Sequence, residues 1–130
     1  MRPLLLVAVA VVAMAYSARN ASPLEGTAWE VQVKSDALFS CRRKDTLIFK
    51  DGLLTVASCA AEGVAPSSYG SEREGAGGAA SWQAALHREG RGTWQWQGVM
   101  RGDAVEGSVL RTLPDGKVRR YRFTGTRRED

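Results

Sequence analysis

Alternation of side chains through residues 93–125 constrains the fold of this chain more than any other feature. Trp94, Trp96 and Met100 fall on one side of this stretch, while Gln95 and Gln97 fall on the other. Side chains two residues apart share a face of a β-strand, so this period predicts strands that are buried on one face. We therefore expect three consecutive antiparallel strands here.

Two turn signals predict how these strands pair. Gly102-Asp103 suits a two-residue hairpin loop, because glycine adopts the positive φ of its first position, and Pro114–Gly116 suits a three-residue loop. The first loop pairs Met100 with Val105, Gly98 with Gly107, Trp96 with Val109 and Trp94 with Arg111, and the second pairs Val109 with Tyr121 and Gly107 with Phe123. Both registers place apolar residues together on one face, which predicts one inner and one outer face.

The rest of the chain repeats this pattern with less regularity. Residues 26–34 and 81–86 alternate, and Asp51-Gly52 predicts a hairpin whose second strand runs from Leu53 to Cys59. Residues 60–80 predict a connection, with at most a short strand near Tyr69 and then a flexible Gly-rich loop. The whole predicts an all-β, up-and-down antiparallel eight-stranded barrel over residues 26–127, because closure removes exposed sheet edges.

The first 17 residues resemble a secretory signal peptide. A basic start, Met1-Arg2-Pro3, precedes an apolar run over residues 4–15 that is shorter than the ~20 residues of a membrane span. Ala13 and Ala15 suit the small-residue rule for cleavage. We expect a secreted or periplasmic protein with a linker at 18–25 and no membrane span, and an uncleaved anchor is the alternative.

The sequence holds two cysteines, Cys41 and Cys59. Export would place them in an oxidising compartment, which favours one intramolecular disulfide, and two buried free thiols are the alternative. The Asp51-Gly52 hairpin sets Cys59 opposite Lys44 rather than Cys41. A bridge therefore requires the strand to bend before Asp45.

Charge and polar motifs exclude several function classes. The net charge of +4 is spread along the strands, whereas a nucleic-acid module usually has a concentrated basic stripe, so no nucleic acid is expected as a partner. His87 is the single histidine, and a catalytic triad or a His-based metal site needs more than one such group. We expect no enzyme activity, no cofactor and no metal.

Gly26-Thr27-Ala28-Trp29, the serial hairpins and a basic residue (Arg127 or Arg128) just past the last strand together resemble the lipocalin and calycin superfamily. The resemblance implies an eight-stranded barrel that binds small apolar molecules. It also implies that Trp29 lies at the closed end, with the late Arg packed over it. The spacing here is Gly-x-x-Trp, one residue longer than the Gly-x-Trp of lipocalins.

A second likeness concerns Arg119-Arg120-Tyr121, which is similar to the Arg-x-Tyr of intracellular fatty-acid-binding barrels, where both side chains hold a ligand carboxylate. The predicted register points Arg119 and Tyr121 inward and sets Arg111 opposite Arg119. The candidate ligand-binding residues are Trp94, Trp96, Arg111, Arg119 and Tyr121. In the alternative interpretation, the arginines reach into water or stack on Trp94, and Tyr121 belongs to the core.

Two functions remain open. One is binding of a small apolar or amphiphilic ligand, and the other is a protein-interaction role such as that of an exported protease inhibitor. An eight-stranded barrel is wide enough either to be filled by side chains or to hold one small ligand, and the bulky inward residues favour a filled interior. The volume of the interior cavity distinguishes the two.

Overall fold

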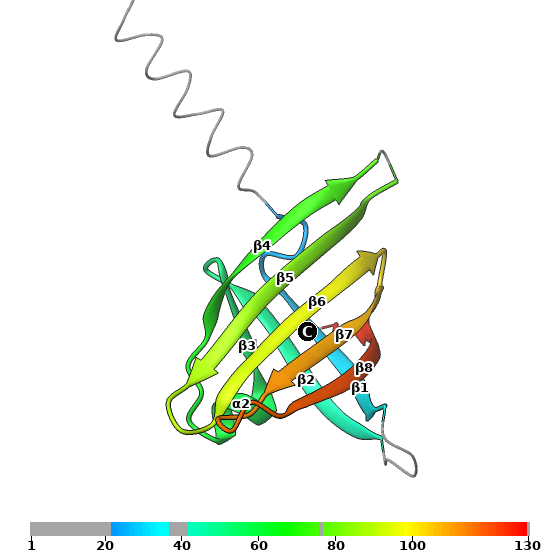
Figure 1. Ribbon diagram of the computed structural model, residues 1–130. Helices are drawn as coiled ribbons and strands as arrows, with labels where there is room; N and C mark the ends of the chain where they lie inside the picture. Colours follow the sequence, from blue (N-terminus) through cyan, green and yellow to red (C-terminus); the bar gives the residue numbers. More distant parts are fainter. Residues whose placement is uncertain (1–21, 37–41, 76, 130) are drawn as a thin grey trace, which may run out of the picture.

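The computed structural model describes residues 22–36, 42–75 and 77–129, and these form a closed barrel of eight antiparallel strands (Figure 1). Each strand pairs with the next along the chain, and β8 pairs with β1 to close the sheet. The strands are β1 (Thr27–Ser35), β2 (Arg43–Lys50), β3 (Leu53–Val56), β4 (Ser67–Glu74), β5 (Ala79–Arg88), β6 (Gly92–Arg101), β7 (Ala104–Thr112) and β8 (Val118–Arg127). The predicted all-β, eight-stranded up-and-down barrel is confirmed.

The hairpin registers predicted from the turn residues are also confirmed. Trp96 lies opposite Val109, which lies opposite Tyr121 on the next strand, and Phe49 lies opposite Leu54. The turn between β6 and β7 contains Gly102 at a φ of 58°, a conformation that glycine adopts without the steric penalty of a Cβ. Turn geometry and hydrophobic pattern therefore specify the same register.

Aromatic side chains fill much of the barrel interior. All four tryptophans are buried, as the alternation predicted. Trp82 contacts Phe49 edge-on, with ring centroids 5.0 Å apart, and its ring lies 5.9 Å from that of Phe123. Edge-to-face and tilted arrangements are those that aromatic quadrupoles favour, so this cluster stabilises the barrel beyond simple burial of apolar area.

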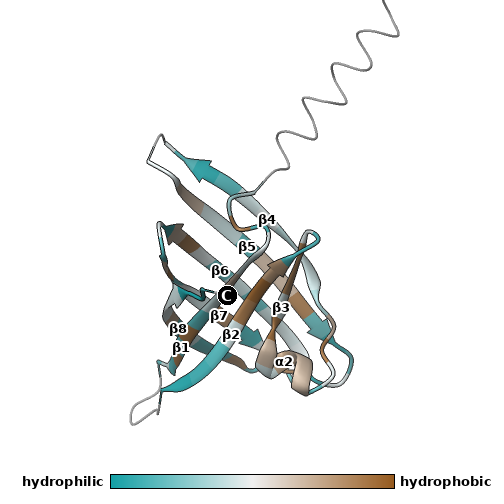
Figure 2. Ribbon diagram, turned by 180° about the vertical axis from the view of Figure 1, so that it is seen from behind, coloured by the Kyte–Doolittle hydropathy of each residue, from teal (hydrophilic) through white to brown (hydrophobic). Residues whose placement is uncertain are grey.

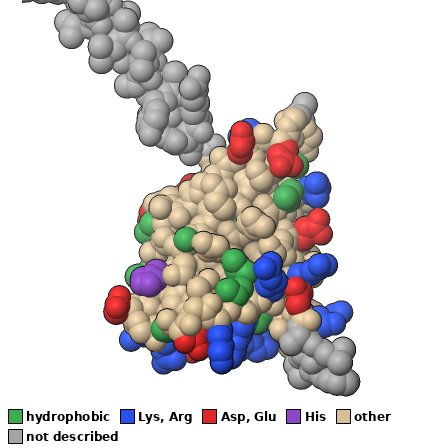
Figure 3. All heavy atoms as spheres, viewed as in Figure 1, with side chains coloured by type: hydrophobic (Ala, Val, Ile, Leu, Met, Phe, Trp, Pro, Cys, Tyr) green, Lys and Arg blue, Asp and Glu red, His purple; other side chains and the backbone are tan. Residues whose placement is uncertain are grey.

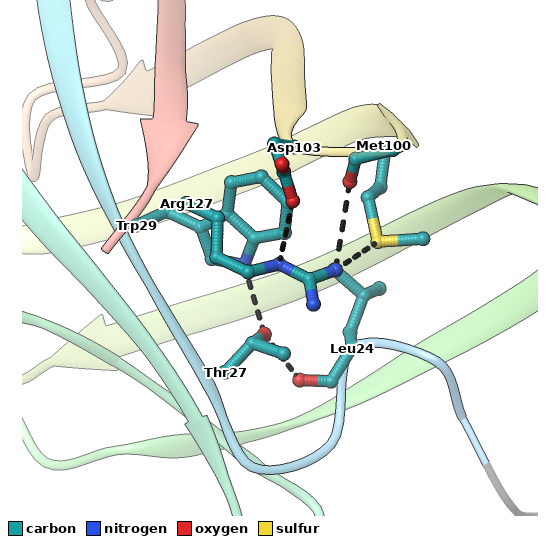
Figure 4. Close-up of polar contacts among 7 residues, drawn as sticks. Leu24, Thr27, Trp29, Met100, Asp103 and Arg127 are labelled. Carbon is teal, nitrogen blue, oxygen red and sulfur yellow. Dashed lines mark hydrogen bonds and ion pairs between the residues drawn. The ribbon is translucent and has the colours of Figure 1, made fainter. Parts of the chain in front are cut away.

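One end of the barrel is closed by the segment before β1 (Figure 4). Leu24 is fully buried, and Thr27 accepts a hydrogen bond of 2.8 Å from Nε1 of Trp29. The guanidinium carbon of Arg127 lies 5.1 Å from the centroid of the Trp29 ring, and Nε of Arg127 lies 3.7 Å from the Asp103 carboxylate. Arg127 is the last residue of β8 rather than a residue beyond it. The packed core therefore begins inside residues 18–25, which were expected to be a linker.

Glu25 fastens this segment to the barrel wall. Its carboxylate accepts hydrogen bonds from the backbone N–H groups of Asp51 and Gly52 and from the hydroxyl of Tyr69. These bonds favour the charged form, and the pKa of Glu25 is lowered from its ordinary value of 4.5. The segment before β1 is thereby tied to the β2–β3 turn and to β4.

The strand expected to run from Leu53 to Cys59 ends at Val56, and that part of the prediction was wrong. Residues 57–61 form a short helix, α2 (Ala57–Ala61), instead. Alanine has the highest helix propensity, and the carboxylate of Asp45 accepts hydrogen bonds from both the N–H and the hydroxyl of Ser58 at the start of this turn. The bend places Cys59 in the interior of the barrel end rather than opposite Lys44.

The expectation of a connection and flexible loop over residues 60–80 was also wrong in part. Residues 67–74 form the eight-residue strand β4, which pairs with β5 from Tyr69 to Glu74. The four residues from Ser71 to Glu74 are exposed, so this strand has no apolar alternation in its sequence. Its pairing with β5, which does alternate, holds it in the sheet, and such tertiary context often overrides β-propensity.

Several expectations concern residues that the structure does not describe. The signal peptide at 1–17 and Cys41 lie outside the described residues, so the signal peptide and the Cys41–Cys59 disulfide remain predictions. Cys59 itself is buried. Within the described ranges, no helix is long and apolar enough to cross a membrane.

Candidate functional site

The barrel end opposite Leu24 contains a pocket of about 380 Å³, which we call the mouth pocket. Figure 2, seen from behind, shows α2 at this end of the barrel. The pocket is lined by Val33, Arg43, Lys44, Asp45, Ser58, Cys59, Ala61, Glu62, Trp94, Trp96, Val109, Arg111 and Tyr121. Five strands and α2 therefore contribute to one site.

The apolar part of the lining follows from the strand register. Trp96, Val109 and Tyr121 lie side by side on β6, β7 and β8, and all three side chains belong to the inner face. Trp96 also packs on Phe123 of the core, with ring centroids 5.2 Å apart. The mouth pocket thus ends where the aromatic core begins, and the interior is filled at one end only.

Arg111 lies against the neighbouring strand inside the mouth pocket. Its guanidinium carbon is 4.6 Å from the centroid of the Trp94 ring, and one terminal nitrogen donates to the carbonyl O of Arg91 at 3.4 Å. This is the stacking that the alternative interpretation anticipated. Stacking uses the face of the guanidinium plane and leaves the N–H groups at its edge able to donate.

Two buried donors in this lining have no hydrogen-bond partner. They are Nε of Arg111 and Nε1 of Trp96. Trp82 likewise has an unpartnered Nε1, and Nε of Arg127 has only the Asp103 carboxylate at 3.7 Å. Most buried polar groups in proteins are hydrogen-bonded, so each exception calls for a specific explanation. Arg111 and Trp96 both line the mouth pocket, but these two nitrogen atoms are themselves buried.

The charged side chains of the pocket carry both signs. Arg43, Lys44 and Arg111 are basic, and Asp45 and Glu62 are acidic. The Asp45 carboxylate is already engaged by Ser58. Lys and Arg side chains also gather along the lower end of the molecule in Figure 3, the end at which α2 lies in Figure 1. With three basic and two acidic side chains, the lining of the pocket carries a net charge of +1.

Cys59 contributes a neutral thiol to the lining. Burial, together with the nearby Asp45 carboxylate, raises the pKa of this thiol to about 11. Because the thiolate is the reactive form, Cys59 is a poor nucleophile and a poor metal ligand at neutral pH. As a free thiol, it packs as a small apolar side chain.

The structure brings together four of the five predicted site residues, Trp94, Trp96, Arg111 and Tyr121. Arg119 lies opposite Arg111, as expected, but its side chain is exposed and does not line the pocket. Arg119 therefore fits the alternative interpretation, in which an arginine near the barrel rim reaches into water. The sequence analysis did not predict that residues of α2 line the pocket, because this five-residue helix shows no helical periodicity in the sequence.

Other surfaces offer less to a ligand. Depressions of about 930 and 900 Å³ lie against the wall formed by β4 to β8, where the outward side chains, such as Gln83, Gln97 and Ser108, are polar. Within residues 22–36, 42–75 and 77–129, no three His, Cys, Asp or Glu side chains gather as metal ligands would. The mouth pocket is therefore the best candidate site.

Comparison with known proteins found no matching family model, no matching curated protein and no matching solved structure.

Proposed function

We propose that this protein is an exported lipocalin-like barrel that binds a small apolar or amphiphilic ligand in the mouth pocket. The observation that carries the proposal is a pocket of about 380 Å³ at one end of a barrel whose other end is packed. Ligand sites are typically clefts of roughly 300–1,000 Å³ with apolar and aromatic walls and a few polar groups. The volume points to a small ligand, near the lower limit of that range.

The closed end supports the lipocalin-like assignment. Arg127 packs over the ring of Trp29 at 5.1 Å, which is the pairing that the resemblance implied. Such a pairing stabilises the sealed end of the barrel, so that a ligand would enter through the opposite end.

The experiment is a binding survey followed by tryptophan fluorescence. Native mass spectrometry of the protein from its own host would detect a ligand that survives purification. A titration with short amphiphiles should change the fluorescence of Trp94 and Trp96, and a Val109→Trp variant, which fills the pocket, should abolish the change. A fluorescence response that persists unchanged in Val109→Trp would place binding elsewhere and contradict the proposal.

A protein-interaction role remains the second candidate, and a sheet edge favours it. Within the described part of the chain, only Ser67 and Ser68 of β4 pair with β3, so residues 70–74 have β5 on one side alone. An unpaired strand edge can accept an extended segment of another protein. Glu72 and Glu74 on this edge would favour a partner segment with basic residues, while discouraging self-association.

Affinity capture from the exported fraction tests this second candidate. The protein should retain a partner or inhibit a protease, and reversing both charges in a Glu72→Arg, Glu74→Arg variant should abolish the effect. A Glu129→Arg variant, altered outside the β4 edge, provides the matched control. Capture that is indifferent to the β4 substitutions would exclude the edge as the interface.

A further inference from the structure

The barrel sorts its charged side chains to its two ends, although basic and acidic residues are interspersed along the sequence. The mouth half, meaning the strand halves and loops around the mouth pocket, contains eleven described basic residues and five acidic ones: Lys34, Arg42, Arg43, Lys44, Arg88, Arg91, Arg111, Lys117, Arg119, Arg120 and Arg122, with Asp36, Asp45, Glu62, Glu89 and Asp115. The closed half contains five basic and eight acidic ones: Lys50, Arg73, Arg101, Arg127 and Arg128, with Glu25, Glu30, Asp51, Glu72, Glu74, Asp103, Glu106 and Glu129. The described residues therefore give the mouth half a net charge of +6 and the closed half one of −3.

We propose that the mouth half docks on an anionic lipid bilayer, so that the mouth pocket faces the membrane. The docking stands on the charge distribution and goes beyond the proposed function, whereas exchange of a ligand between the pocket and the bilayer rests on that function. A basic side chain close to an anionic bilayer strengthens binding about fivefold, and this attraction fades within about 10 Å at 0.1 M salt. A strand of ten residues, such as β6, spans about 33 Å, so only the half that faces the lipid contributes.

Several basic side chains of the mouth half are available to lipid head groups. Arg119 and Arg120 are exposed at the start of β8, and neither forms an ion pair within the described part of the chain. Nε of Arg122 lies 3.7 Å from the Asp36 carboxylate, and these exposed partners attract each other only weakly. Figure 3 shows Lys and Arg side chains along the lower edge of the molecule, where they surround the mouth.

The β7–β8 turn adds an exposed aliphatic side chain to this basic surface. Val118 is 49% exposed, more than any other large apolar side chain that the structure describes, and it lies between Lys117 and Arg119 in the sequence. The turn is held by a hydrogen bond of 2.8 Å from the N–H of Leu113 to the carbonyl O of Lys117. An aliphatic side chain flanked by cations suits a membrane interface, where it enters the acyl boundary while the cations stay at the head groups.

The same surface is less suited to nucleic acid. Sites for single-stranded nucleic acid combine basic groups with exposed aromatic side chains on which the bases stack. Every tryptophan and every phenylalanine that the structure describes is buried. Trp94 and Trp96 line the mouth pocket instead, among the basic residues. A bilayer is an anionic surface that also contains amphiphiles, the class of ligand proposed for this pocket.

Flotation with vesicles tests the docking, using protein recovered from the exported fraction. The wild type should bind vesicles of phosphatidylcholine and phosphatidylglycerol (7:3) at 0.1 M NaCl, and it should bind neither pure phosphatidylcholine vesicles nor the mixed vesicles at 1 M NaCl. An Arg119→Glu, Arg120→Glu variant should bind the mixed vesicles at least about 25-fold more weakly, which is about fivefold for each arginine. A Lys50→Glu, Arg73→Glu variant has the same net charge but is altered in the closed half, so it should bind as the wild type does.

A tryptophan reporter tests the orientation. In Val118→Trp, the fluorescence emission should shift to shorter wavelength when mixed vesicles are added, because the new side chain enters the bilayer interface. In Leu53→Trp, which places the reporter beside the β2–β3 turn of the closed half, the emission should not respond. Circular dichroism and thermal unfolding of each variant establish that the barrel is intact.

The outcomes separate docking from ligand binding. Absence of binding to mixed vesicles, equal binding to both kinds of vesicle, an equal loss in the two charge-reversed variants or an equal shift in the two reporters would overturn the docking. Preference for a single-stranded oligonucleotide over mixed vesicles, lost in Arg119→Glu, Arg120→Glu, would assign the mouth half to nucleic acid instead. The titration with short amphiphiles, made without vesicles, reports on the pocket alone, so the proposed function can fail while the docking stands, and the reverse.

Discussion

Replacement of Gly107 by alanine should destabilise the barrel by clashing with the backbone of the neighbouring strand. A Cβ on Gly107 would stand 2.0 Å from the carbonyl O of Gln97 and 2.6 Å from Cα of Gly98, whereas real Cβ atoms essentially never come within 3.0 Å of such atoms. Strands β6 and β7 would have to separate locally by about 1 Å from their normal spacing of roughly 4.8 Å. Overpacking of this kind costs about 1–3 kcal/mol.

The Phe123 ring is a second obstacle, because its Cζ atom would lie 2.7 Å from the new Cβ. A side chain can move or be shortened, but the backbone of Gln97 cannot. We therefore expect that Phe123→Leu will not rescue Gly107→Ala, and that a double-mutant cycle will show a favourable coupling below about 0.5 kcal/mol. Gly77→Ala is the control, because a Cβ there meets nothing within 4 Å and the residue has no positive φ.

Urea denaturation and thermal unfolding measure this effect. Gly107→Ala should lower the melting temperature by roughly 4–8 °C for each kcal/mol lost, which is the sensitivity of a domain of about 100 residues. Gly77→Ala should leave stability unchanged or raise it slightly, because alanine restricts the unfolded chain. A stable Gly107→Ala variant, or full rescue by Phe123→Leu, would refute the argument that the backbone approach requires glycine.

Three further predictions follow from the closed end and the pocket. Arg127→Met should lower the free energy of unfolding by about 1 kcal/mol, because it removes the cation–π contact with Trp29, and chemical denaturation would measure this loss. The pKa of the Glu25 carboxyl is lower in the folded protein than in the unfolded chain, so its stabilising effect is present above pH 4.5 and is lost as the pH falls through the pKa of the folded protein. Glu25→Gln should therefore flatten the dependence of the urea midpoint on pH below pH 4.5. In a Cys41→Ser variant, Cys59 should resist alkylation at pH 8 until the protein unfolds, because burial raises its pKa to about 11, and mass spectrometry of the labelled protein would detect any early reaction. Alkylation of the unfolded, unreduced wild type reports on the disulfide, since a bridged pair takes up no label and two free thiols take up two.

Much of the fold could be predicted because the local signals agreed. The glycine at 102 and the loop at 114–116 each implied a register, and the two registers placed Trp96, Val109 and Tyr121 on one face. Residues 67–74 could not be recognised in the same way, since an exposed polar strand has no apolar alternation. Only pairing with β5 defines it. The helix after Val56 was missed because five residues are too few to display a helical period.

The candidate site was predicted in part, and the reason for the shortfall is geometric. Alternation correctly placed Trp94, Trp96 and Arg111 on the inner face, but it cannot show where along a strand the interior opens to water. Arg119 has the parity of an inward residue and is nevertheless exposed. Leu24 shows the reverse case: it lies in a polar stretch that was expected to be a linker, yet its side chain is fully buried.

Apart from β4, the strands, their pairing order and their division into inner and outer faces were determined by the sequence, because each depends on periodicity and turn chemistry within a few residues. The tertiary structure decided which end of the barrel is sealed and which holds a pocket. That difference arises from contacts between distant segments, namely Leu24 and Arg127 at one end and α2 with Trp94 and Arg111 at the other. No local pattern encodes such contacts, because they form only when the sheet has closed.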